Sequence, residues 1–555
     1  MDSPTPLRWT QNSFPRSVAP IVCAATVFAV HLAVVILSVT VPVSLFVNTF
    51  RDENGWDLSA WRNTFGDAGR WVSLLENTFG TLLVSLTVSL VLALLLSVLL
   101  FKTDVPLRKS CIALLVCAAA FPLYVAGATL IGLAGEAVRV QRSVLALGMV
   151  HGLAHLPLVV LLGGLAISRV PRGLEEAAIV EGASLPQVLY KVTLRGALPG
   201  FLAAALLTTL WVTGDYSASD TLLVRTFAEE VYTQFAMHAR VAEPTLVSLP
   251  QAVLIGTVLW CSRNLFFSAD GAFAASGITK RFSLGGARYP LSALCVLLTL
   301  LVGGAPIVVL AGKLDPDRGL DHFVRVFLPE LQTSLWTSLL AGACCSLLAV
   351  GLAWYAVRSK FWRFVVSAYA VLVLATPPPV LGIGLIHLLN RPDWRGAIYD
   401  SPLTLVVAYT IRFLPLAVLV LVPAIRSVSR DWESSARVDG CTKLQVWARV
   451  LLPLCLPAML VAFFLVTALS LGEVPCSLLV TPPGYQTVGA RFFSLIHYGL
   501  QGEAAALCLL AVGMILIPTG GLLLVLGRHC GTGVAPASQK LECQKEGEVP
   551  APQKT

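Results

Sequence analysis

Long apolar stretches alternate with short polar segments along most of the chain. A helix needs about 20 apolar residues to cross the hydrocarbon core of a bilayer. Twelve stretches reach about this length, approximately at 18–41, 74–101, 110–134, 143–167, 197–214, 245–262, 289–312, 332–357, 364–389, 402–424, 455–480 and 502–527. The pattern predicts an all-α, polytopic membrane protein with about 12 transmembrane helices. In two of these stretches, Pro122 and the proline run 377–379 would break or kink the helix.

The composition excludes most other classes of protein. Charged residues make up 13% of the 555 residues and hydrophobic residues 56%, whereas a soluble domain carries about 25% charged residues. Disorder is excluded as well, because a disordered chain has few apolar and many charged residues. Most of the 13 cysteines lie inside apolar runs, where we interpret them as small hydrophobic residues and not as a disulfide framework.

The positive charge reports membrane topology. A net charge of +8 would suit a nucleic acid, but Lys and Arg gather in alternate loops, for example at 102–109, 169–195 and 426–449. The positive-inside rule places these loops and both termini in the cytoplasm. We therefore expect a multi-pass protein of the bacterial plasma (inner) membrane, in contact with the lipid bilayer and with no nucleic acid partner.

The cytoplasmic loop after the fourth predicted helix has a counterpart after the tenth. In one register, Glu175 matches Glu433 and Gly182 matches Gly440, and the match extends into the neighbouring spans. Such a repeat predicts two tandem halves of six helices each, in the same orientation.

The repeat and the two chain ends divide the sequence into six parts. The first apolar run is longer than the 7–15 residues of a signal-peptide core, so we expect a retained helix. The predicted parts are a cytoplasmic N-terminus (1–17), the first helix with an outer loop (18–72), a first transmembrane domain (73–263), a connecting loop with the seventh helix and an outer loop (264–328), a second transmembrane domain (329–527), and a polar, disordered cytoplasmic tail (528–555).

The repeated loop has the composition of a docking surface. Its Glu-Glu-Ala-Ala run favours a short helix, and Gly182 permits the sharp turn that would end it. Small alanines allow another protein to approach closely, while the carboxylates would meet Arg or Lys. A solvated re-entry loop is the alternative, but the recurrence favours docking. The candidate residues are Glu175, Glu176, Ala177, Ala178, Glu181, Gly182, Glu433, Ala436, Asp439 and Gly440.

These residues resemble the EAA loop of type I ABC-importer permeases. The first copy has Glu-Ala-Ala at 176–178, then Gly182 and Val-Thr-Leu at 192–194, although Arg195 replaces the final proline. The second copy keeps Gly440 and Pro453 but has Ser-Ser-Ala at 434–436. The resemblance covers roughly 74–262 and 332–527. It implies a type I ABC permease architecture, with two halves fused as in the permeases of ferric-iron and thiamine importers.

The same resemblance implies the partners. In that family each such loop docks into a cytoplasmic ATPase subunit, so we expect two copies of the ATPase and an extracytoplasmic substrate-binding protein. The sequence has no GxxxxGK[ST] phosphate loop, HExxH or GxSxG motif. We therefore expect no catalytic, metal-binding or cofactor-binding residue in this chain, with ATP-Mg bound by the partner ATPase.

A few ionisable residues are candidates for the transport pathway. A charge inside a membrane costs about 2.5–3.5 kcal/mol, so retained charges usually face a cavity or a partner. Asp215 and Glu473 fall at the outer ends of matching helices, where they either line the pathway or are solvated at the interface. Arg412 lies within a span, where it either extends outward to the membrane surface or lines the pathway. The i, i+4 pair His151 and His155 is interpreted as a helix–helix contact or, alternatively, a metal contact.

Two alternatives remain open at this stage. A secondary transporter also has 12 helices in two halves, but it should place more ionisable groups within its spans, and it does not explain the paired loops. For the substrate, the segments that follow Thr213 and Ser470 resemble those of ferric-iron importers, which makes ferric iron the first hypothesis. Thiamine, a polyamine or a phosphonate are the alternatives.

Overall fold

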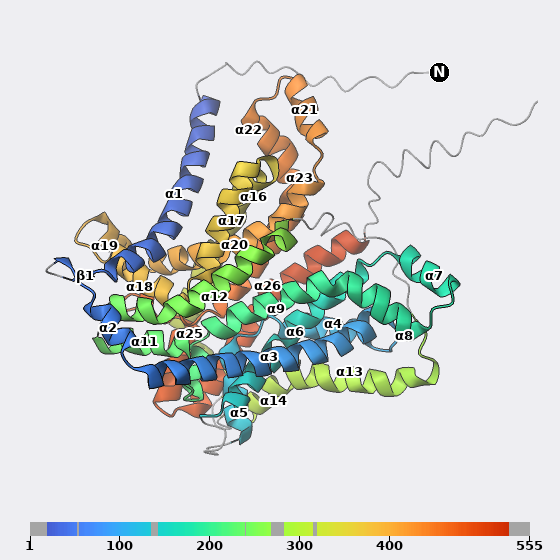
Figure 1. The fold of residues 1–555 in the computed structure, drawn as a ribbon, viewed down its shortest axis with the longest axis horizontal. Coiled ribbons are helices and arrows are strands. Elements are labelled where there is room, and N and C mark those ends of the chain that lie inside the picture. The colour runs from blue at the N-terminus through green and yellow to red at the C-terminus, as the bar shows by residue number, and fades with distance from the viewer. Residues whose placement is uncertain are drawn as a thin grey trace, which may run out of the picture.

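The computed structural model describes residues 19–52, 55–134, 142–238, 240–267, 282–314 and 319–531. The predicted segment 1–17 and most of the predicted tail 528–555 lie outside these residues. Within them the chain is helical (Figure 1), apart from a small hairpin of β1 (Arg51–Asp52) and β2 (Gly55–Trp56). The all-α prediction is confirmed.

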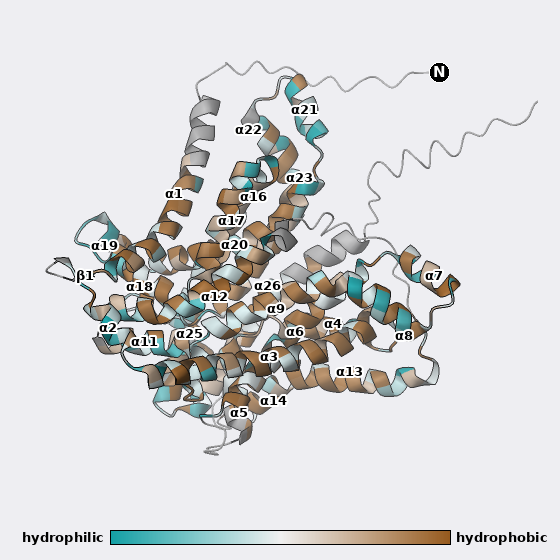
Figure 2. Cartoon of the chain, in the orientation of Figure 1, coloured by the Kyte–Doolittle hydropathy of each residue, from teal (hydrophilic) through white to brown (hydrophobic). Residues whose placement is uncertain are grey.

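Ten of the described helices are long and apolar enough to cross a membrane. They lie in α1 (Ala19–Asn48), α3 (Ala68–Lys102), α6 (Val144–Ser168), α9 (Arg195–Gly214), α12 (Ala242–Phe267), α13 (Arg288–Gly303), α16 (Leu328–Arg358), α20 (Leu403–Ser427), α23 (Leu452–Leu471) and α26 (Gln501–Gly531). Figure 2 shows apolar residues along these helices, with hydrophilic residues gathered beyond their ends, for example at α21 (Arg430–Val438) and α19 (Trp394–Tyr399).

Two further spans are broken where the sequence places proline. Helices α4 (Arg108–Ala118) and α5 (Leu123–Ala134) meet at a bend of 99°, and α17 (Lys360–Ala375) and α18 (Pro378–Leu389) at one of 101°. Proline removes a backbone donor and clashes with the preceding turn, so a continuous helix is disfavoured there. Counting each bent pair as one span gives the predicted number of 12.

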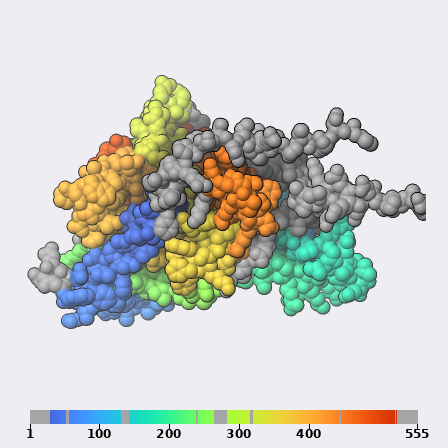
Figure 3. All heavy atoms as spheres, turned by 90° about the horizontal axis from the view of Figure 1, so that it is seen from above, coloured from blue at the N-terminus to red at the C-terminus, as the bar shows by residue number. Residues whose placement is uncertain are grey.

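The first helix of each half packs against the other half. Helix α1 lies on α16, α17 and α18, where the His31 ring contacts the backbone oxygen of Leu348 at 3.0 Å and Asn48 Nδ2 lies 2.9 Å from His387 Nε2. Figure 3 shows the blue N-terminal part of the chain against yellow residues of the second half. The two halves are thus interlocked through their first helices, an arrangement that the repeat does not specify.

Helix α13 makes the reciprocal contact with the first half, against α4, α3 and α6. The Ser292 hydroxyl donates to the backbone oxygen of Pro106 at 2.8 Å. The chain entering α13 is also bonded to the end of α3, because the Phe282 N–H donates to the Lys102 oxygen at 2.8 Å and the Leu284 N–H to Asp104 at 2.9 Å. The Leu284 N–H stabilises the carboxylate and lowers the pKa of Asp104.

Candidate functional site

Each repeated loop is a short helix, a glycine turn and a return into the membrane, as the sequence predicted. Helix α7 (Arg172–Val180) ends before Gly182, which has φ 88°, and α21 ends before Gly440, with φ 84°. L-residues with a side chain rarely adopt this conformation. The chain continues through α8 (Leu185–Val188) or α22 (Lys443–Val446) and then through a π-helix, η1 (Leu189–Leu194) or η3 (Trp447–Leu451). In Figure 1, α7 and α21 lie at the edges of the molecule, far from α2 (Ser59–Phe65) and α11 (Phe227–His238).

Glu175 does not present its carboxylate to a partner, and this corrects the sequence-based expectation. Lys102 Nζ, at the end of α3, lies 2.7 Å and 2.9 Å from the two carboxylate oxygens. The Thr193 hydroxyl donates to the same carboxylate at 2.7 Å. Both charged side chains are fully buried. Successive residues of a helix differ by about 100° in direction, so Glu175 points inward while Glu176 points outward.

Glu433 is buried in the same way, so the expectation that it faces a partner is also wrong. Its carboxylate pairs with Arg358, the last residue of α16. Arg358 also donates to the backbone oxygen of Val428 at 3.2 Å. The sequence analysis missed Lys102 and Arg358, although each is a basic residue at the inner end of the second helix of its half.

The exposed face of both loops is apolar as well as charged. Val180 and Val438 are 86% and 87% exposed and occupy matching positions, as do Leu174 and Trp432, each 58% exposed. Among the predicted docking residues, Ala177, Glu181, Gly182, Asp439 and Gly440 are exposed, while Glu176, Ala178 and Ala436 are half-buried. The same pattern of exposed apolar side chains thus occurs in both loops. Their recurrence in the repeat was the signal that sequence reasoning overlooked.

A cavity of about 320 Å³ lies between the two halves. The three predicted pathway residues, Asp215, Glu473 and Arg412, all line it, together with His155 and Trp211. The structure therefore brings together residues that are nearly 260 positions apart in the sequence.

Asp215 and Glu473 are buried, so solvation at the interface does not explain them. The Asp215 carboxylate accepts from the Ser217 hydroxyl at 2.7 Å and the Ala218 N–H at 2.8 Å, at the start of α10 (Ser217–Thr221). Glu473 accepts from two N–H groups, each at 2.8 Å, at the start of α24 (Ser477–Val480). Carboxylates at these positions satisfy backbone donors that the short helices leave unpaired.

Arg412 pairs with Glu473 and keeps 18% of its side chain exposed. It projects from α20 into the cavity. This arrangement satisfies a charge that would otherwise be costly within a span.

Glycine and proline close the space between the halves in two reciprocal contacts. A Cβ added at Gly214 would lie 3.1 Å from Pro378 Cδ, and one added at Gly472 would lie 3.3 Å from Pro122 Cγ. In each contact the glycine ends the fifth helix of one half, and the proline belongs to the broken span of the other. A second cavity of about 40 Å³ adjoins this region, lined by Arg412, Gly214 and Pro378.

The histidine pair makes contacts within the protein. His151 is buried, with Nε2 3.7 Å from Asp215 Oδ2, and the His155 ring nitrogen Nδ1 lies 2.9 Å from the His151 backbone oxygen. The two rings are stacked, with centroids 5.7 Å apart. In the described part of the chain, no group of three His, Cys, Asp or Glu residues is placed to hold a metal ion.

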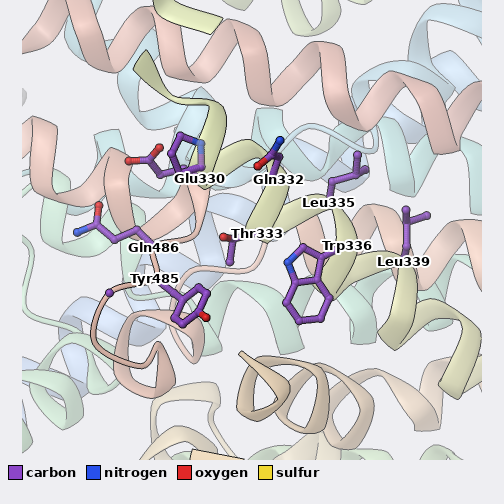
Figure 4. Close-up of a pocket in the computed structure, with 10 residues that line it drawn as sticks. Glu330, Gln332, Thr333, Leu335, Trp336, Leu339, Tyr485 and Gln486 are labelled. Carbon is purple, nitrogen blue, oxygen red and sulfur yellow. The ribbon is translucent and has the colours of Figure 1, made fainter. Parts of the chain in front are cut away.

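Each half also has an open groove, near the start of α3 in the first half and of α16 in the second. The groove of the second half, about 880 Å³, is lined by Glu330, Trp336, Tyr485 and Gln486. Figure 4 shows Trp336 and Tyr485 facing the same opening. The matching groove of about 520 Å³ includes Asn77 and is lined mainly by charged and polar residues. The two grooves thus occupy equivalent places but differ in chemistry.

The chain is similar to known membrane permeases. The family model described as "Binding-protein-dependent transport system inner membrane component" matches residues 346–529. The molybdenum transport system permease protein of Mycobacterium tuberculosis is 33% identical over 187 residues, which cover 31% of this chain and 69% of that protein. A putative 2-aminoethylphosphonate transport system permease protein of Salmonella typhimurium is 28% identical over 217 residues, covering 37% and 79%. A probable ABC transporter permease protein of Sinorhizobium fredii is 29% identical over 330 residues, covering 54% and 57%.

Proposed function

Because the chain belongs to the family of binding-protein-dependent transport system inner membrane components, the permeases of ABC importers, we propose that its two halves form one translocation pathway driven by two copies of a cytoplasmic ATPase. The observation that carries this proposal is the pair of matching loops. Each has a helix, a positive-φ glycine and exposed apolar residues at the same place in its half. We propose one ATPase subunit on each loop, with both termini in the cytoplasm.

The cavity between the halves is the proposed route. Its walls come from both halves of the chain and include Pro122, Gly214 and Gly472 of the glycine–proline contacts. Movement of one half relative to the other would open it. An extracytoplasmic binding protein would deliver the substrate to the opposite side from the loops, where the two grooves are found. We keep 73–263 and 329–527 as the two transmembrane domains.

For the substrate we propose ferric iron first. Two acidic side chains and one basic side chain line the cavity, and an excess of acidic groups favours a cation. A phosphonate is the second candidate, because one relative is named as a putative 2-aminoethylphosphonate permease.

The test is reconstitution of the chain with its ATPase and binding protein in liposomes. We expect no ATP hydrolysis by the purified chain alone, and uptake that requires ATP in the complex. Uptake driven by a proton or sodium gradient without ATP would instead establish a secondary transporter. Uptake of labelled ferric iron and of 2-aminoethylphosphonate is then compared between cells with and without this chain. The substrate whose uptake is lost without the chain separates the two proposals.

A further inference from the structure

We propose that two buried ion pairs, Lys102–Glu175 and Arg358–Glu433, position the coupling helices and pass the movement of the ATPase to the helices around the cavity. We call them the anchor pairs. The inference rests on the proposed function, since it assumes that α7 and α21 dock on the ATPase. It assigns a role in coupling to four residues, none of which faces the partner.

The anchor pairs join the same two elements in both halves. Lys102 is the last residue of α3 and Arg358 the last residue of α16. Each reaches the carboxylate of a glutamate in the first turn of the loop helix. Helix α7 otherwise packs mainly against α8 and η1, which belong to its own loop. The ion pair therefore links the docking helix directly to α3 in the first half and to α16 in the second.

The anchor pairs are buried at a place where apolar side chains would also hold the loop. Both side chains of the first pair are fully buried, and those of the second are 14% and 7% exposed. Removing two charges from water is costly, and apolar residues of similar volume often stabilise a site equally well. Charged hydrogen bonds, however, fix direction as well as distance. Two halves that use different basic residues, Lys and Arg, retain the same directional link.

The backbone route from the loop into the membrane is irregular in both halves. The π-helices η1 and η3 lie between the docking helix and the fifth span. Segments of π-helix are rare and are often found at functional sites. Thr193 of η1 donates to Glu175, whereas Leu451 occupies the matching place in η3. The first anchor pair thus also ties the π-helix to α3.

The helices that carry the anchor pairs pack along the walls of the cavity. Helix α3 packs along α6, which carries His155, and α16 packs along α20 and α23, which carry Arg412 and Phe464. A displacement of α7 or α21 would therefore be transmitted through two adjacent, tightly packed helices to residues that line the cavity.

The experiment uses the reconstituted complex and measures ATP hydrolysis and uptake together. The double variant Lys102→Met/Glu175→Gln removes both charges and leaves no unpaired one. We expect normal membrane abundance and normal ATPase co-purification, with substrate imported per ATP reduced about tenfold, a typical size for coupling between sites. Arg358→Met/Glu433→Gln should behave likewise. Lys102→Arg should keep the wild-type ratio, because arginine serves at the matching position.

Asp321→Asn is the control, since it breaks an exposed i, i+4 pair with Arg325 that lies outside both loops and should leave the ratio unchanged. A wild-type ratio in the Lys102→Met/Glu175→Gln variant overturns the inference. If that variant does not accumulate, the exchanged pair Lys102→Glu/Glu175→Lys decides: recovery of the ratio supports the anchor role, and failure to recover it overturns it. Absence of ATP-dependent uptake by the wild-type complex would refute the proposed function instead.

Discussion

At the scale of single residues, neighbouring side chains of the repeated loops have opposite roles. Glu175 and Glu433 are buried in ion pairs, whereas Val180 and Val438 are among the most exposed apolar residues of the described chain. The surface available to a partner is therefore apolar as well as charged, and Glu181 and Asp439 belong to its exposed residues. Exposed ion pairs contribute only about 0.2–1 kcal/mol each, so apolar contact should dominate docking.

Val180→Asp and Val438→Asp should therefore weaken binding of the ATPase. Burying a valine side chain is worth about 1.5–3 kcal/mol, so each change should reduce ATPase co-purification by about tenfold or more. Pull-down of the ATPase with the tagged chain measures this effect. Leu58→Asp is the control, because Leu58 is 52% exposed but lies in the predicted outer loop. Full ATPase recovery with both valine variants would show that this surface is not the docking site.

Gly182→Val and Gly440→Val should abolish transport without preventing membrane insertion. Each glycine has a positive φ, and a β-branched residue there costs about 1–3 kcal/mol. No described atom lies within 4 Å of an added Cβ at either glycine, so the effect comes from the backbone. Gly173→Val is the matched control, since Gly173 is equally uncrowded but helical. Uptake at the wild-type level in both glycine variants would exclude a role for the turns.

At the scale of elements, the interlocked first helices determine how the halves assemble. Helix α1 meets the second half through polar contacts as well as apolar ones, and small residues allow the close approach. A Cβ at Gly351 would overlap the His31 ring. Small residues at such contacts are typical of helix packing in membranes.

Gly351→Leu should displace α1 and destabilise the protein. Overpacking of a tight contact costs about 1–3 kcal/mol, so we expect lower membrane abundance and faster proteolysis. Immunoblots of membranes and limited proteolysis measure these effects. Gly513→Leu serves as the control, because no described atom lies within 4 Å of an added Cβ at Gly513. Equal abundance and equal protease resistance for the two variants would contradict the importance of this contact.

At the scale of the whole molecule, the two halves meet around the cavity in a pseudo-symmetric way. The reciprocal contacts of Gly214 with Pro378 and of Gly472 with Pro122 join the end of a fifth helix to the broken span of the opposite half. If transport requires the halves to separate there, a covalent link across either contact should stop it.

The paired variants Gly214→Cys/Pro378→Cys and Gly472→Cys/Pro122→Cys test this requirement. A disulfide needs a Cβ–Cβ distance of about 3.5–4.5 Å. A Cβ added at Gly472 would lie 3.4 Å from Pro122 Cβ, and one added at Gly214 would lie more than 4 Å from Pro378 Cβ. Oxidation should block uptake by the reconstituted complex, and a reductant should restore it. Gly382→Cys/Leu479→Cys is the control within one half, where the two residues are also in contact. Undiminished uptake through a quantitatively cross-linked pair would show that this contact does not open.

The sequence alone determined the features that depend on local chemistry. The number of spans follows from apolar length, the two broken spans from proline, and the loop turns from glycine at positions that require a positive φ. The repeat then predicted the two halves, their matching loops and the candidate residues Asp215 and Glu473, and the position of its charge within a span made Arg412 the third candidate. These inferences need only the hydrophobic thickness of a membrane and the conformational limits of the backbone.

Only the tertiary structure decided which residues meet. Glu175 and Glu176 are adjacent and chemically identical, and their opposite orientations became clear only when Lys102, 73 positions away, was found beside one of them. The exchange of α1 and α13 between the halves was likewise hidden, because apolar helices carry little sequence information about which apolar neighbour they contact. Pairing of distant side chains depends on the packing of whole helices, and a local pattern does not specify that packing.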